Sequence, residues 1–91
     1  MADYRTQRIV FSGRRQRITT PERQCYCCGK SMRGKTLREI HVINGGLEVL
    51  HPDDEFLYSS DAGDLYWYAI GPECARQLGL EWTYKPERKV L

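Results

Sequence analysis

The sequence lacks any long hydrophobic run, and this excludes a conventional membrane-spanning helix. No apolar stretch approaches the ~20 residues that such a helix needs. Met1 is not followed by the apolar core of a secretory signal peptide. Internal repeats and low-complexity segments are also missing. We therefore expect a cytoplasmic protein with no membrane partner.

The chain is also short. The chain has 91 residues, of which 41% are hydrophobic and 29% are charged. This composition is ordinary for a globular protein and argues against disorder along most of the chain. A single domain of this size buries only a modest fraction of its surface. The sequence therefore predicts one small domain that needs a constraint besides its hydrophobic core.

Cysteine is present in a pattern that can supply this constraint. There are four cysteines, and three of them fall in Cys25-Tyr26-Cys27-Cys28-Gly29-Lys30. Because disulfides are rare in a reducing compartment, clustered thiols there usually bind a metal or act in catalysis. Glycine after Cys28 suits a tight metal-binding turn, in which the backbone takes a positive φ.

Positive charge is concentrated near the start of the chain. Residues 1–24 carry six arginines against Asp3 and Glu22, a net charge of +4, whereas residues 25–91 carry eight basic and ten acidic residues, a net charge of −2. A basic segment of this kind favours an acidic partner, either nucleic acid phosphate or an acidic protein face.

The rest of the sequence predicts an α+β fold. Residues 37–43 and 47–51 read as two strands joined by Asn44-Gly45-Gly46, and residues 65–70 read as a third strand. A short helix should follow, with Pro72 at its first position and Gly79 as its C-terminal cap. The expected architecture is a small zinc-stabilised domain that combines a zinc knuckle, an antiparallel hairpin or three-stranded sheet and this helix.

The termini are the least regular parts of the sequence. Residues 8–11 could form a strand, with a turn at Ser12-Gly13 and a return strand over residues 14–19; alternatively residues 1–22 form a mobile basic arm. We assign residues 23–84 to the zinc-binding domain and residues 85–91 to a tail. Trp82 and Tyr84 are expected to anchor the end of the domain.

The predicted metal is one structural Zn²⁺. Cys25 and Cys28 supply two ligands from the turn, and Cys74 supplies a third from the first turn of the helix, where the dipole favours a thiolate. His51 is the preferred fourth ligand. His41, Cys27, water or an acidic side chain are alternatives, with Cys27 disfavoured because a residue inside the turn should point away from the metal. Buried thiols without metal, or a redox pair, are the competing interpretations.

Two short motifs carry a resemblance. Cys25-x-x-Cys28-Gly29-Lys30 and Ile70-Gly71-Pro72-Glu73-Cys74-Ala75-Arg76 together resemble small uncharacterised zinc-binding proteins of bacteriophages and bacteria. Their cores pair a Cys-x-x-Cys-Gly-basic knuckle with a Gly-Pro-x-Cys-Ala helix start, in a treble-clef-like layout. The resemblance implies a compact zinc-stabilised module, plausibly encoded by a phage and acting in the host cytoplasm, that binds a host or viral macromolecule.

Nucleic acid is the preferred partner. Binding would be mainly electrostatic, because no recognition-helix pattern is present. Tyr66, Trp67 and Tyr68 could stack on bases, although aromatic residues in a strand are more often core. The residues expected to meet phosphates are the basic ones of the first segment and of the knuckle: Arg5, Arg8, Arg14, Arg15, Arg17, Lys30, Arg33 and Lys35.

A host protein is the alternative partner, bound through the acidic segment Asp53-Asp54-Glu55 with Asp61 and Asp64. An enzyme is not expected. Glu73 beside Cys74 could be imagined as a base, but the second Cys-x-x-Cys pair of zinc deaminases is missing downstream. Little chain remains to build a pocket for a small-molecule substrate.

Overall fold

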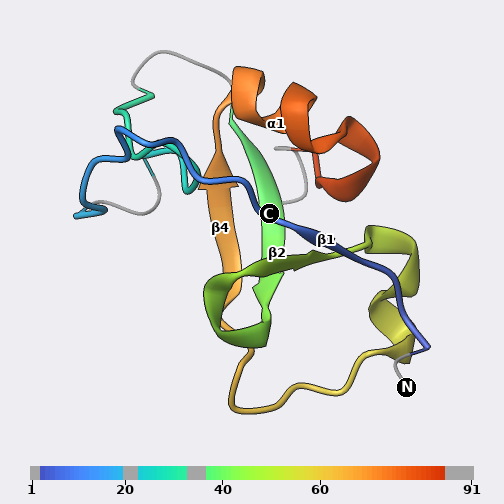
Figure 1. The fold of residues 1–91 in the computed structure, drawn as a ribbon. Coiled ribbons are helices and arrows are strands. Elements are labelled where there is room, and N and C mark those ends of the chain that lie inside the picture. The colour runs from blue at the N-terminus through green and yellow to red at the C-terminus, as the bar shows by residue number, and fades with distance from the viewer. Residues whose placement is uncertain (1–2, 20–22, 33–36, 86–91) are drawn as a thin grey trace.

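The computed structural model describes residues 3–19, 23–32 and 37–85. These residues form a four-stranded antiparallel sheet and one α-helix, so the α+β class is confirmed (Figure 1). Across the sheet the strands lie in the order β1 (Thr6–Arg8), β3 (Glu48–Leu50), β2 (Arg38–Ile43) and β4 (Tyr66–Ile70).

The central hairpin is the one that the sequence predicts. β2 and β3 are joined by a single 3₁₀ turn, η1 (Asn44–Gly46). Val42 lies opposite Val49 and Ile43 lies opposite Glu48, which is the register that a two-residue turn at Gly45-Gly46 requires. The local turn chemistry therefore sets the pairing correctly.

The two edges of the sheet come from distant parts of the chain. β4 runs antiparallel to β2, with His41 opposite Trp67. β1 pairs antiparallel with β3, and Gln7 lies opposite Val49. This differs from the expected N-terminal hairpin over residues 8–19, because residues 14–19 form no strand. A longer-range pairing has taken the place of the local one.

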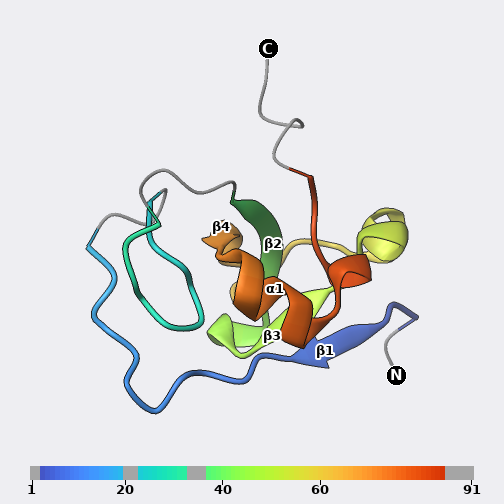
Figure 2. The same ribbon diagram turned by 90° about the horizontal axis from the view of Figure 1, so that it is seen from above.

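The helix α1 (Pro72–Leu78) covers one face of the sheet (Figure 2). Proline occupies its first turn and Gly79, with φ of 111°, ends it, as predicted. Ala75 of α1 packs in a single cluster that includes sheet residues and the cysteine turn: Ile9, Cys25, Tyr26, Cys27, Ile40, Val42, Val49 and Ile70. We call this side the thiol face. Within the described ranges, no helix combines the length and the apolar character that crossing a bilayer would require.

The opposite face of the sheet is also covered. Five of the six residues of β2 are buried, so β2 is enclosed on both sides. Here the cover comes from η2 (Pro52–Leu57), the segment that follows it, and the residues after η3 (Leu80–Trp82). Tyr84 exchanges two backbone hydrogen bonds with Glu39 (2.7 and 3.1 Å), which confirms it as an anchor. We call this side the carboxylate face.

Candidate metal centre

The cysteine turn is closed by its own backbone. The Gly29 N–H donates to the Cys25 carbonyl (2.6 Å), and the Cys25 N–H donates to the Lys30 carbonyl (3.1 Å). Gly29 has φ of 75°, as the sequence predicts, and a Cβ there would lie 2.2 Å from the Gln16 carbonyl oxygen. Glycine is therefore required both by the turn and by the close approach of the chain before it.

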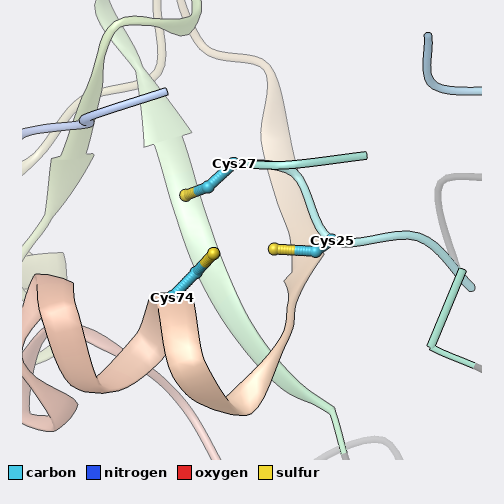
Figure 3. A group of neighbouring side chains, drawn as sticks. All are labelled: Cys25, Cys27 and Cys74. Carbon is cyan, nitrogen blue, oxygen red and sulfur yellow. The ribbon is translucent and has the colours of Figure 1, made fainter. Parts of the chain in front are cut away.

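Three sulfur atoms meet where this turn faces the start of α1. The Sγ atoms of Cys25, Cys27 and Cys74 all lie within 4.8 Å of one another (Figure 3). Cys25 and Cys27 are buried, and Cys74 is half-buried. The turn and the helix, nearly fifty positions apart in sequence, thus bring their thiols to one point.

Backbone donors converge on one of these sulfurs. The interaction with the Cys27 side chain lowers the pKa of Cys25 to about 4 despite its burial, and the backbone N–H groups of Gly71, Cys28 and Cys27 act in the same direction. The pKa of Cys27 is raised by that same side-chain hydrogen bond and by burial, and burial raises the pKa of Cys74. Cys25 is therefore the most acidic of the three thiols, and its two neighbours are harder to ionise while no cation is present.

The three sulfurs fit a metal ion. In a tetrahedral site with Zn–S bonds of about 2.3 Å, neighbouring sulfurs lie about 3.8 Å apart. The present separations, at most 4.8 Å, need only a small contraction to reach that value. A divalent cation would also favour the thiolate form of all three cysteines. The group can therefore hold a metal ion.

The fourth cysteine lies beside this group. The Cys28 side chain contributes to the raised pKa of Cys74, after the larger effects of burial and of Cys25. Both residues line a cavity of about 340 Å³ that also borders Lys30 and Pro72. Cys28 therefore has a half-buried position next to the site and space in which to reorient.

Cys27 is the member of the group that the sequence interpretation disfavoured. The argument that a residue inside the turn points away from the metal does not hold here, because Cys27 Sγ points to the same place as those of Cys25 and Cys74 (Figure 3). The run of three cysteines within four residues was the available signal. The hydrogen bond from the Gly29 N–H to the Cys25 carbonyl closes the turn. In this closed turn the Cys27 side chain points inward.

Neither histidine belongs to the thiol group. The His51 Nδ1 accepts the Asp53 N–H (3.1 Å), and its ring packs edge-on against Trp82 with centroids 4.8 Å apart. His41 lies on the carboxylate face, between Glu55 and Asp64. The structure thus brings Cys25 and Cys74 together as predicted and places His51 in other contacts.

The chain before the cysteines packs directly onto the turn. The Ser12 N–H donates to the Cys27 carbonyl (3.1 Å), and the Gln16 N–H donates to the Cys28 carbonyl (2.9 Å). The Arg15 Nε donates to the Tyr26 carbonyl (2.8 Å). We call residues 12–17 the arginine segment. Its position depends on three consecutive carbonyl groups of the cysteine turn.

The predicted phosphate-binding residues fall into separate groups. Arg5 immediately precedes β1 and pairs with Asp54 (2.8 Å), and the Arg15 guanidinium lies 5.0 Å from the Phe11 ring centroid. Four residues are exposed and make no ion pair with any residue in the described ranges: Arg8, Arg14, Arg17 and Lys30. Arg33 and Lys35 lie outside the described residues.

The other candidate binding residues are mostly used internally. Among the acidic side chains, Asp54, Glu55 and Asp64 bond to residues of the domain, whereas Asp53 and Asp61 are exposed. Among the aromatic ones, Trp67 stacks on His41 (4.2 Å) and Tyr68 packs on Tyr26 (4.7 Å), while Tyr66 is 60% exposed. The strand aromatics therefore offer little open surface for base stacking.

Comparison with known proteins finds no matching family, no matching curated protein and no matching solved structure. What this site does is therefore inferred from its own residues and geometry.

Proposed function

We propose that this chain is a small zinc-binding module in which Zn²⁺ joins the cysteine turn to α1. The convergence of the Cys25, Cys27 and Cys74 sulfurs carries this proposal. Thiolate sites of this kind supply folding energy in domains too small for a large core. A turn that donates backbone N–H groups to sulfur, followed by a ligand at a helix start, supports a treble-clef-like arrangement.

Cys28 is the proposed fourth ligand in place of His51. Cys28 and Cys74 line the same cavity, which gives the Cys28 side chain room to change its rotamer toward the ion. His51 would instead have to give up the hydrogen bond from Asp53 and its packing on Trp82. Four thiolates form a closed structural site, and that donor set favours zinc over the hard cations.

Cobalt substitution tests both the site and its fourth ligand. We expect Co²⁺ to bind one per chain with the absorption of a tetrahedral, sulfur-rich centre. Cys28→Ser should weaken the sulfur-to-cobalt charge-transfer band, whereas His51→Ala should leave the spectrum unchanged. Failure of the wild-type chain to bind Co²⁺ or Zn²⁺ would remove the proposal. The opposite pattern in the two variants would restore His51 as the ligand.

We further propose that the module binds nucleic acid through the arginine segment and the neighbouring Lys30. Arg14 and Arg17 are exposed, and the backbone that carries them is held by the carbonyl groups of the cysteine turn. The ion would thus order a loop in which Arg14 and Arg17 make no ion pair with any described residue. This arrangement suits contact with phosphates.

The expected binding is electrostatic and largely independent of sequence. Phosphate contacts position a protein on nucleic acid but carry no base information. Trp67 and Tyr68 are engaged by His41 and Tyr26, which leaves the sheet without a stacking platform for bases. Affinity should therefore fall steeply with salt and vary little between sequences of equal length.

Gel-shift titrations at two salt concentrations test this interface. The double variant Arg14→Ala/Arg17→Ala should lose most of its affinity at low salt and show a shallower salt dependence. The double variant Arg76→Ala/Lys85→Ala is the matched control for charge, because both residues are exposed and lie away from the arginine segment in sequence. No binding by the wild-type protein at low salt, or equal losses in both variants, would contradict the proposal.

A protein partner remains the alternative function. Phe56 is 83% exposed and Leu57 is 42% exposed, on η2 next to the exposed Asp53. An exposed apolar pair beside an acidic residue suits a phage-type factor that binds a host protein. A pull-down from host lysate with the wild type and with Phe56→Ser tests it: reproducible capture lost in the variant would support this function, and no capture would count against it.

A further inference from the structure

The carboxylate face contains a buried ion cluster that plays no part in the proposed metal site. His41 is buried, with a side chain that is 3% exposed. Its Nδ1 lies 2.7 Å from the Glu55 Oε2, and its Nε2 lies 2.8 Å from the Asp64 Oδ1. A single imidazole thus contacts a carboxylate oxygen at each of its nitrogens.

The number of carboxylate acceptors around the His41 ring indicates how many of its nitrogens carry a proton. A neutral imidazole has one N–H, so it could donate to only one carboxylate and would place a lone pair against the other. A protonated carboxyl group could relieve that conflict, but each of the two carboxyl oxygens already accepts a second hydrogen bond, which favours its ionised form. The Tyr84 hydroxyl donates to the Glu55 Oε2 (2.5 Å), and the Tyr66 N–H donates to the Asp64 Oδ1 (2.8 Å).

The environment of Asp64 supports the same conclusion. Burial alone would raise the pKa of Asp64, but hydrogen bonds from His41, Ser60 and the Tyr66 N–H, together with the charge of His41, leave it below its ordinary value. Trp67 stacks on the His41 ring with centroids 4.2 Å apart, and an aromatic face of this kind stabilises a cation.

We infer that His41 is a doubly protonated imidazolium that latches the acidic segment 52–64 and the residues around Tyr84 onto β2. Glu55 contributes from η2, and Asp64 contributes from the residues before β4. Tyr58 packs edge-on against the ring from the same acidic segment (5.5 Å). Loss of the second proton would leave two facing carboxylates with only one donor, and the segment would loosen.

Nitrogen NMR of the two imidazole rings in the full chain tests the protonation state directly. At neutral pH both nitrogens of His41 should carry protons. His51 is the internal reference, because its Nδ1 accepts the Asp53 N–H and must therefore be unprotonated. As the pH is raised, the amide resonances of Tyr66 and Tyr84 should shift together with the His41 ring. A His41 ring with one bare nitrogen at neutral pH would overturn the inference.

Hydrogen exchange tests the latch separately from the protonation state. In His41→Gln, which can donate to only one side, exchange at the Tyr66 and Tyr84 amides should speed up by about tenfold, the factor that the loss of one charged hydrogen bond corresponds to. His51→Gln should leave these amides unchanged. Equal exchange in His41→Gln and the wild type would contradict the latch. If His41→Gln does not fold, the NMR test on the native chain still decides.

Discussion

The two faces of the sheet both enclose acidic groups, but the chemistry of those groups differs. β2 presents Ile40 and Val42 to the thiol face and His41 to the carboxylate face. On both faces the interior contains acidic groups that need a cation: thiols on one and carboxylates on the other. The carboxylate face obtains its cation from the chain itself, as His41. The thiol face has no basic group among its three converging donors, and the cation that we propose for it is a metal ion from solution.

This difference predicts which parts of the domain should lose their structure when each face is disrupted. The carboxylate face is complete when the chain folds, and its loss should affect mainly the acidic segment and the residues around Tyr84. The thiol face joins Cys25 to Cys74 and also holds the arginine segment through the turn carbonyls. Its failure should therefore spread through the domain.

Cys25→Ser should be the most damaging single change. It removes a proposed metal ligand, and with it the thiol whose pKa the Cys27 side chain and three backbone N–H groups lower. Structural zinc contributes about 10–16 kcal/mol of apparent binding energy in small domains, which exceeds the whole stability of many of them. Near-ultraviolet circular dichroism with zinc present should show loss of fixed packing. His51→Ala should keep its zinc and its packing, and equal unfolding of both variants would contradict this assignment.

His41→Ala should destabilise the protein without releasing the metal. It leaves the buried Asp64 and the neighbouring Glu55 without their cation, a change that typically costs about 3–5 kcal/mol in other proteins. Urea denaturation measures the loss, and zinc analysis of the same sample checks that the thiol face is intact. Loss of zinc along with stability would show that the two faces are not independent.

Gly29→Ala should cost more than Gly45→Ala, although both residues have nearly the same backbone conformation. Gly29 has φ of 75° and Gly45 has φ of 73°, but a Cβ meets the Gln16 carbonyl at 2.2 Å only in the first case. Each substitution should cost about 1–3 kcal/mol from backbone strain. Gly29→Ala should in addition displace the arginine segment and weaken nucleic acid binding. Equal nucleic acid binding by the two variants would show that the arginine segment does not depend on the cysteine turn.

Lowering the pH should produce the smallest effect on stability, through the ion pair between Arg5, next to β1, and Asp54 of η2. The side-chain hydrogen bond from Arg5 lowers the pKa of Asp54 from 3.8 to about 2. A depressed pKa stabilises the fold above the ordinary value, and this contribution is lost as the pH falls from 3.8 towards 2. In denaturation curves across that range, Asp54→Asn should show a shallower loss of stability than the wild type. An identical slope would show that the pair contributes nothing.

The features that sequence predicted are those with local signals. The register of β2 on β3 follows from the glycine turn, and the limits of α1 follow from Pro72 and Gly79. The positive φ of Gly29 follows from its place after the cysteines. In each case the physical cause lies within a few residues of the feature.

The features that sequence did not predict depend on contacts between distant segments. β1 pairs with β3 across about forty residues, and nothing local distinguishes this from a hairpin. Asp54 and Asp64 read as surface charges until Arg5 and His41 are placed beside them. Cys27 faces the site because of the way the turn closes, which spacing alone does not show.

The central claim is that one metal ion from solution completes the thiol face, and the most direct measurement is metal content combined with thermal unfolding in the presence and absence of a chelator. We predict one zinc per purified chain and a large loss of thermal stability after chelation, reversed by added Zn²⁺. A protein without stoichiometric metal that melts at the same temperature with and without EDTA would contradict it.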